Sequence, residues 1–409
     1  MGRIPGVGLL LAASMLLPSA AGAASIFSLN GMGEPIEAAD VRALGMGGAT
    51  IAVGDGRSLS TVNPATARAE ELAMLGVELS PGALRTEGPE AELSTESFGF
   101  EMARLLFPVG ETTTLALGLH TEASFDTPRI ETTLEQDSLV YRRSTQSTGT
   151  ISAIGGGLAF DLGAITIGAR GDYLFGSAVE DWLLGFEGDT LFHDSSNRPI
   201  PIRDQVDRWR TSILGTQFSL GLLWRGKGVD IGVFGTYSPW AEGFQEYEGL
   251  ASGLESRTHS SYSMPPRAGA GIAWRPFGGV TLAADGELSA WSSFEVDGAT
   301  LPAMSDVYRL AAGLEWYLGR EGTYLSENLP LRVGGALSPL PYRIASQGGG
   351  WRRVDVSRLT LGTGLRFAGG RGWADLAFEY IVRDEGTIRE REYRFHISLG
   401  AMERWARKL

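Results

Sequence analysis

Two stretches of the chain carry aromatic and aliphatic residues at a spacing that would form a binding surface. In each stretch the apolar residues recur three and four positions apart, which is the pattern of one face of an amphipathic helix. Such a face would hold an apolar ligand, or it would cover the end of a larger structure and touch no ligand. The candidate ligand-binding residues are Trp182, Leu183 and Phe186 in the first stretch and Trp240, Phe244 and Tyr247 in the second.

Residues for catalysis or metal binding do not form a recognisable set. The chain contains no Cys, which excludes thiolate catalysis and zinc–sulfur sites. None of the histidines has the two-His spacing of a zinc protease, and the Gly45–Thr50 run lacks the third glycine of a dinucleotide fingerprint. The four histidines are His120, His193, His259 and His396. The sequence therefore predicts no enzyme activity, no catalytic or metal-binding residue and no cofactor.

The elements that must position the apolar stretches are short segments of alternating hydrophobicity. Each segment is long enough for a tilted strand of about 9–11 residues that crosses an outer membrane. In residues 218–224, for example, Phe218, Leu220 and Leu222 share one face, and Ser219 and Gly221 share the other. Fourteen segments have this character: 73–84, 97–107, 112–123, 148–161, 163–176, 211–225, 229–240, 262–276, 279–292, 306–318, 329–339, 356–368, 371–383 and 391–402.

The connections between these segments alternate in length. Short connections follow the even-numbered segments, as at 108–110, 226–228 and 276–278, and long ones follow odd-numbered segments, at 124–147, 177–210 and 241–261. Tight periplasmic turns and long outer loops produce this rhythm in a transmembrane barrel. We therefore predict an all-β protein, an antiparallel up-and-down barrel of about 14 strands over residues 73–402, with a tail at 403–409. Inward charges such as Arg309 and Glu315 are expected to pair across strands.

Composition and the N-terminus agree with an exported membrane protein. The chain has 409 residues, with 57 Gly and only 20% charged residues, and no later apolar run reaches the roughly 18 residues of a membrane-spanning helix. Residues 1–23 have a basic Arg3, an apolar core over 7–17 and an Ala21-Gly22-Ala23 cleavage site, so they predict a cleaved signal peptide. The formal net charge of −13 disfavours nucleic-acid binding.

Residues 41–66 form a glycine-rich segment that precedes the barrel. Its glycines Gly45, Gly47 and Gly48 allow close backbone approach, and Asn63-Pro64 is a turn dipeptide. The run Arg42-Ala43-Leu44-Gly45-Met46-Gly47-Gly48-Ala49, followed by Asp55 and by Asn63-Pro64-Ala65, resembles the hatch of the FadL superfamily of outer-membrane barrels. That superfamily includes long-chain fatty acid transporters and PorV-type relatives. Ser60-Thr61-Val62 departs from the PorV pattern, which has aromatic residues there.

The resemblance implies an architecture and two alternative functions. Residues 24–72 would be a hatch inside the barrel, with Gly45, Gly47, Gly48, Asn63 and Pro64 as its characteristic residues. The first function is passive uptake of small hydrophobic compounds, such as long-chain fatty acids, across the outer membrane, with the two apolar stretches as an outer reception groove. The alternative is a PorV-type structural or shuttle component that binds secretion-system proteins. Expected partners are outer-membrane lipids, a hydrophobic ligand and the barrel assembly machinery.

Overall fold

The computed structural model describes most of the chain after the predicted signal peptide. The described residues are 25–29, 32–68, 72–89, 92–136, 139–186, 191–193, 199–201, 204–249, 252–317, 329–345, 349–368 and 371–404. The predicted signal peptide over residues 1–23 and residues 405–409 of the predicted tail lie outside them.

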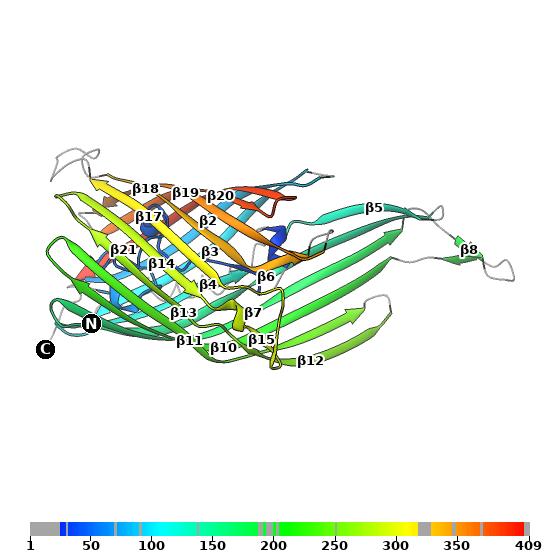
Figure 1. Ribbon diagram of the computed structural model, residues 1–409, viewed down its shortest axis with the longest axis horizontal. Helices are drawn as coiled ribbons and strands as arrows, with labels where there is room; N and C mark the ends of the chain where they lie inside the picture. Colours follow the sequence, from blue (N-terminus) through cyan, green and yellow to red (C-terminus); the bar gives the residue numbers. More distant parts are fainter. Residues whose placement is uncertain are drawn as a thin grey trace.

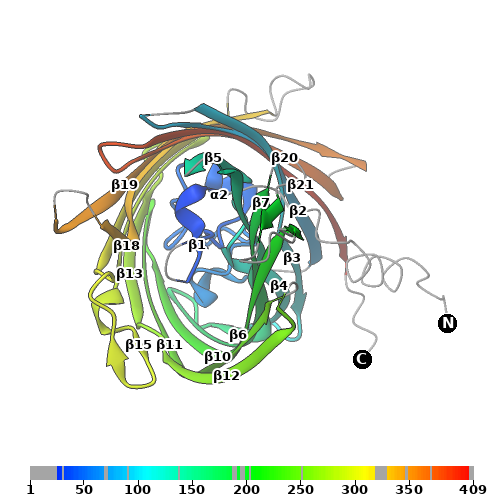
Figure 2. The same ribbon diagram turned by 90° about the vertical axis from the view of Figure 1, so that its right-hand side faces the viewer.

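The described chain forms a closed antiparallel barrel of 14 strands, as predicted (Figure 2). Each strand pairs with its neighbours in the sequence, and the last pairs with the first, from Leu72 opposite Arg404 to Glu87 opposite Arg389. The barrel strands are β2 (Leu72–Glu87), β3 (Glu92–Pro108), β4 (Thr113–Ser124), β6 (Leu139–Asp161), β7 (Ile165–Phe186), β10 (Gln205–Arg225), β11 (Val229–Gly249), β13 (Arg267–Trp274), β14 (Val280–Ser289), β17 (Val307–Tyr317), β18 (Pro330–Ala345), β19 (Trp351–Phe367), β20 (Gly372–Asp384) and β21 (Arg389–Arg404).

Smaller elements line the lumen or extend the wall. The short helices are η1 (Ile26–Leu29), α2 (Val41–Leu44), η2 (Pro64–Thr66) and η3 (Trp291–Ser293). The remaining strands are β1 (Glu34–Pro35), β5 (Ile130–Gln136), β8 (Leu191–His193), β9 (Pro199–Pro201), β12 (Leu254–Ser263), β15 (Glu295–Val296) and β16 (Ala299–Thr300). Among the described residues, no helix has the length and apolar character needed to cross a membrane.

Strand alternation separates an apolar outer face from a polar lumen. Phe218 and Leu220 of β10 are 56% and 65% exposed on the outside, whereas Ser219 between them is buried. The predicted pairing of inward charges is also present, since Arg309 of β17 contacts Glu287 of β14 at 2.9 Å. The outer wall therefore offers the apolar band that a membrane-spanning barrel requires.

The prediction of helices in two outer loops is wrong. Strands β6, β7, β10 and β11 are 21 to 23 residues long, and with β5 and β12 their ends form a sheet that projects from one end of the barrel (Figure 1). We call this the projecting sheet. Trp182 and Phe186 lie in β7, and Trp240 and Phe244 lie in β11. The helical spacing was misleading because pairing with neighbouring strands, which no local pattern records, satisfies the backbone hydrogen bonds here.

Residues 32–67 lie inside the barrel, where Figure 2 shows them in blue. We call them the inner segment; they fall within the predicted hatch at 24–72. Met46 and Ala49 have no exposed surface, and they pack against small wall residues such as Ala311 and Ala336. The inner segment is thus enclosed by the strands that follow it in the sequence.

Candidate functional site

Buried ion pairs fasten the inner segment to the barrel wall. The guanidinium of Arg42 meets Asp55 at 2.8 Å and Glu315 of β17 at 2.6 Å. Glu315 also accepts from Arg332 of β18 at 2.8 Å, and Arg332 reaches Asp375 of β20 at 2.6 Å. Burial alone would raise the pKa of Asp55, but Arg42 holds that pKa well below its usual value. The chain of charges therefore stays ionised and links the inner segment to three strands.

A second set of charges surrounds Glu37, closer to the projecting sheet. Its carboxylate pairs with Arg309 of β17 and lies 3.3 Å from Arg358 of β19. Burial raises the pKa of Glu37 to about 7, because the two arginines offset only part of the loss of hydration. Unlike Asp55, Glu37 therefore changes charge near neutral pH.

Short polar side chains fix the path of the inner segment itself. Asp40 caps α2 by accepting from the backbone N–H of Ala43 at 2.8 Å, and it also accepts from the N–H of Leu59 at 2.6 Å. Asn63 caps η2 by accepting from Ala65 N–H, and its amide donates to the carbonyl of Ile51 at 2.7 Å. Pro64 follows as the first residue of η2. Asn63 and Pro64 thus make a turn that ties the two halves of the inner segment together.

Two of the predicted hatch glycines, Gly45 and Gly47, lie where the backbone of the inner segment meets the backbone of the barrel wall. Gly47 and Gly48 have φ values of 71° and 79°, which favour glycine. A Cβ on Gly47 would stand 2.5 Å from the backbone nitrogen of Gly335 in β18, and one on Gly45 would stand 3.2 Å from Cα of Gly362 in β19. Gly335 and Gly362 of the wall also lack side chains, so Gly45 and Gly47 let the inner segment pack directly against the wall backbone. A Cβ on Gly48 would instead meet the side chains of Glu37 and Arg309.

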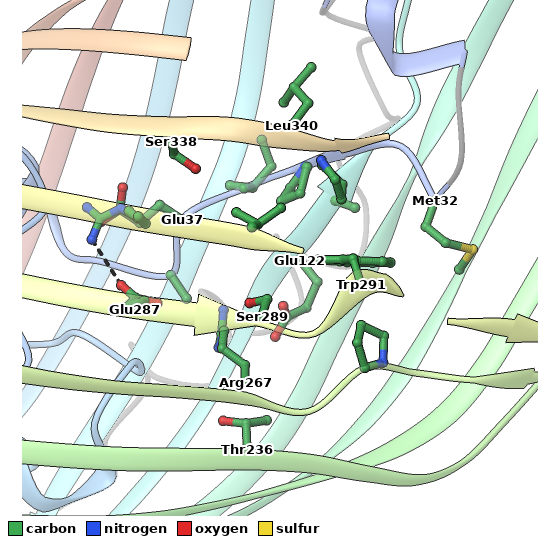
Figure 3. Close-up of a pocket in the computed structure, with 18 of the residues that line it drawn as sticks. Met32, Glu37, Glu122, Thr236, Arg267, Glu287, Ser289, Trp291, Ser338 and Leu340 are labelled. Carbon is green, nitrogen blue, oxygen red and sulfur yellow. Dashed lines mark hydrogen bonds and ion pairs between the residues drawn. The ribbon is translucent and has the colours of Figure 1, made fainter. Parts of the chain in front are cut away.

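A cavity of about 180 Å³ lies in the lumen between the inner segment and the projecting sheet (Figure 3). Apolar side chains from distant elements surround it, including Met32 of the inner segment, Trp291 of η3 and Leu340 of β18. Glu122 of β4 and Arg267 of β13 add polar groups to its lining. Sequence reasoning missed this cavity because its lining comes from at least eight separate elements and has no local motif.

Two of the polar lining groups differ in how they are satisfied. Glu122 accepts hydrogen bonds from His120 at 2.8 Å and from Gln217 at 3.3 Å. Arg267 stacks over the ring of Phe234 at 5.6 Å and has no carboxylate within ion-pair distance among the described residues. Arg267 is therefore a cation at the cavity edge with hydrogen-bonding capacity to spare.

The six predicted loop residues do not form one groove. The paired register places Trp182 and Tyr247 on the face of the projecting sheet that continues the lumen wall, and Phe186 also lies on that face, 6.3 Å from the ring of Tyr141. The other three residues, Leu183, Trp240 and Phe244, lie on the opposite face. Half of the predicted set thus faces toward the cavity.

A family model described as BamG matches residues 1–227, which is more than half of the chain. The chain belongs to the BamG family. No curated protein matches it in sequence.

The fold of this BamG-family barrel is shared with solved FadL-type structures. A FadL homologue of Pseudomonas aeruginosa has a TM-score of 0.60 and 15% identity, covering 91% of this chain and 100% of that one. The toluene transporter TbuX of Ralstonia pickettii has a TM-score of 0.62 and 15% identity, covering 92% and 99%. The toluene transporter TodX of Pseudomonas putida has a TM-score of 0.59 and 15% identity, covering 91% and 99%. The likeness in fold that the glycine-rich motif predicted is therefore present.

Proposed function

We propose that this BamG-family barrel lies in the outer membrane and takes up small hydrophobic compounds, such as long-chain fatty acids, by passive diffusion through its lumen. The observation that carries the proposal is the cavity lined by Met32, Trp291 and Leu340, which is apolar over most of its wall and has Arg267 at its edge. Support comes from structures of the same fold whose names describe toluene transporters and a monoaromatic hydrocarbon channel. The predicted signal at residues 1–23 would supply export.

Capture would need no energy source. Each CH₂ group that leaves water for an apolar wall contributes about 0.8 kcal/mol. The carboxylate of a fatty acid would find a charge-assisted hydrogen bond at Arg267, while its chain packs against Trp291 and Leu340. The cavity of about 180 Å³ is smaller than the roughly 300–1,000 Å³ of a drug-sized site. It would therefore hold a compact hydrocarbon or one end of a long chain.

Onward passage would require the inner segment to move. Its seat is made of buried ion pairs at Arg42 and of backbone contacts at Gly47. The charges around Glu37 border both the cavity and the inner segment, so a ligand in the cavity would act first on this region. We propose local displacement near Glu37, with the Arg42 pairs holding the rest of the inner segment in place.

Mass spectrometry of the protein purified from native membranes in mild detergent tests this function. We expect a bound fatty acid or hydrocarbon, and we expect it to be displaced when Leu340→Arg fills the cavity with a charged side chain. Thr258→Arg, at an exposed position of β12 in the projecting sheet and outside the cavity lining, is the control. The absence of a bound fatty acid or hydrocarbon in both the native protein and the control would overturn the proposal.

A second candidate function follows from the family name, since BamG suggests a link with the barrel assembly machinery. The filled lumen and the exposed charges of the projecting sheet, such as the Asp181–Arg208 pair, suit a protein-binding role as well. The same purification separates the two functions. A stoichiometric protein partner, found without any bound fatty acid or hydrocarbon, would favour the assembly role or the PorV-type alternative.

A further inference from the structure

A second cavity lies at the opposite end of the barrel, among the short turns. It measures about 320 Å³, and Arg57 of the inner segment and Arg366 of β19 line it. Apolar side chains from three barrel strands complete the wall: Met74 of β2, Leu365 of β19 and Trp373 of β20. Short turns mark the periplasmic end of such barrels. This cavity is therefore at the expected exit and is separate from the one that Glu37 borders.

The arginines of this end fall into two kinds. Arg42 and Arg332 are buried and are neutralised by three carboxylates, those of Asp55, Glu315 and Asp375. Arg57 and Arg366 are exposed, and neither has a carboxylate within ion-pair distance in the part of the chain that the structure describes. The only side-chain hydrogen bond that the structure gives to Arg57 is a long one of 3.4 Å, to the hydroxyl of Tyr317.

The charge balance leaves this cavity positive in an acidic protein. Four arginines face three carboxylates here, whereas the whole chain has a net charge of −13. Arg42, Arg57 and Arg366 carry like charges along the wall of one cavity and repel one another. An anion placed between Arg57 and Arg366 would remove this repulsion without disturbing the buried pairs.

The cavity is open as well as positive. Arg57 and Tyr317 also line a neighbouring pocket of about 500 Å³, whose wall includes Phe277 and Val280. The two pockets meet at Arg57, so an amphiphile has room for its head group between them. Planar guanidinium groups bind carboxylate and phosphate with paired hydrogen bonds and carry less hydration than ammonium groups.

We propose that Arg57 and Arg366 form a binding site for the anionic head group of an amphiphile, either carboxylate or phosphate, whose apolar chain lies against Met74, Leu365 and Trp373. The site deepens the proposed uptake function and rests on it, because it would receive an acid that leaves the lumen. A free fatty acid and a membrane phospholipid share this head-group chemistry, and the test below distinguishes them.

Photo-crosslinking of the purified full chain tests the site. The probes are a diazirine-labelled fatty acid, the fatty alcohol of equal length and a diazirine-labelled lysophospholipid, and labelled peptides are identified by mass spectrometry. We expect the fatty acid or the lysophospholipid to label peptides that contain Met74 or Trp373, and the alcohol to label them about tenfold less. Which of the two anionic probes labels these peptides identifies the source of the head group.

Paired variants make the result specific. Arg57→Gln with Arg366→Gln should reduce labelling of these peptides about tenfold, and the lysine double variant, which keeps charge but loses the planar fork, should fall between. Lys227→Gln removes an exposed cation from the β10–β11 turn at the same end and should change nothing. Heat-modifiable mobility on gels verifies that each variant is folded.

The outcomes separate this site from the uptake function. Equal labelling by acid and alcohol, or unchanged labelling in the glutamine double variant, would overturn the site. Labelling at Met74 and Trp373 without any labelling near Met32 or Leu340 would leave the site standing and would count against uptake through the cavity beside the projecting sheet.

Discussion

The inner segment and the projecting sheet are stabilised by different kinds of interaction. The inner segment has almost no exposed surface and is held by ion pairs whose members are nearly inaccessible, such as Arg42 at 7% and Glu315 at 1%. The projecting sheet is held by backbone pairing, and its ion pairs are open to solvent, as with Arg208 at 38% and Asp181 at 41%. Substitutions of the same kinds of residue should therefore have large effects on stability and conductance in the inner segment and small effects in the projecting sheet.

The largest difference is expected for glycine. Gly47→Val would place side-chain atoms in the backbone of Gly335 at a φ of 71°, so the inner segment could not seat. The barrel strands pair without Gly47, so we expect heat-modifiable mobility to persist while conductance in planar bilayers rises from near zero. Left-handed strain alone costs about 1–2 kcal/mol, and the clash adds to it.

Gly253→Val is the matched control for this experiment. Gly253 has a φ of 68° in the turn between β11 and β12, and nothing lies within 4 Å of the position of its Cβ. The Gly253→Val variant therefore has the left-handed backbone strain but no steric clash. The conductance of this variant should equal that of the native protein. Conductance that rises equally in both variants would mean that the seat at Gly47 is not what closes the lumen.

The next largest difference concerns ion pairs. Glu315→Gln removes the carboxylate shared by Arg42 and Arg332, and leaving buried charges unpaired should lower the free energy of unfolding by about 3–5 kcal/mol. Asp181→Asn breaks the exposed pair with Arg208 and should cost at most about 1 kcal/mol. Urea unfolding in detergent, followed by tryptophan fluorescence, measures both. Similar costs for the two variants would contradict the contrast.

These differences explain which parts of the fold and of the candidate site could be predicted from the sequence. The barrel was predictable because each strand's alternation reflects its own two environments, as at Phe218 and Ser219. The glycine-rich motif was recognisable because Asn63 makes its hydrogen bonds within the inner segment. The loop helices were wrong because the ends of β7 and β11 depend on pairing with distant strands. The cavity that Arg267 borders could not be found at all, since its lining has no local pattern.

A smaller effect is expected from pH. Burial raises the pKa of Glu37 to about 7, above the usual 4.5, so the folded state binds the proton more tightly than the unfolded state. Its contribution is fully present below about pH 4.5 and is lost as pH rises through about 7. We expect the free energy of unfolding to fall by about 1–3 kcal/mol from pH 5 to pH 8.

Glu37→Gln should reduce this pH dependence by the share that Glu37 contributes, because the amide does not titrate. Asp126, whose pKa burial also raises to about 6, keeps its own share. Glu246→Gln in the projecting sheet, whose partner Arg257 is largely exposed, should keep it. Urea unfolding at pH 5, 6, 7 and 8 makes the comparison. A slope that is identical in Glu37→Gln and the native protein would assign the pH dependence to other groups.

The smallest effect separates the two faces of the projecting sheet. Trp182 lies on the face that continues the lumen wall, whereas Trp240 lies on the opposite face, although both are about 40% exposed. If ligand reaches the cavity along the inner face, Trp182→Ser should slow uptake of a labelled fatty acid about threefold, the value of one exposed aromatic contact. Trp240→Ser should leave the rate nearly unchanged, and neither should alter stability by more than about 0.5 kcal/mol. Equal losses would mean that both faces collect ligand, and a loss confined to Trp240→Ser would place the entry route on the outer face.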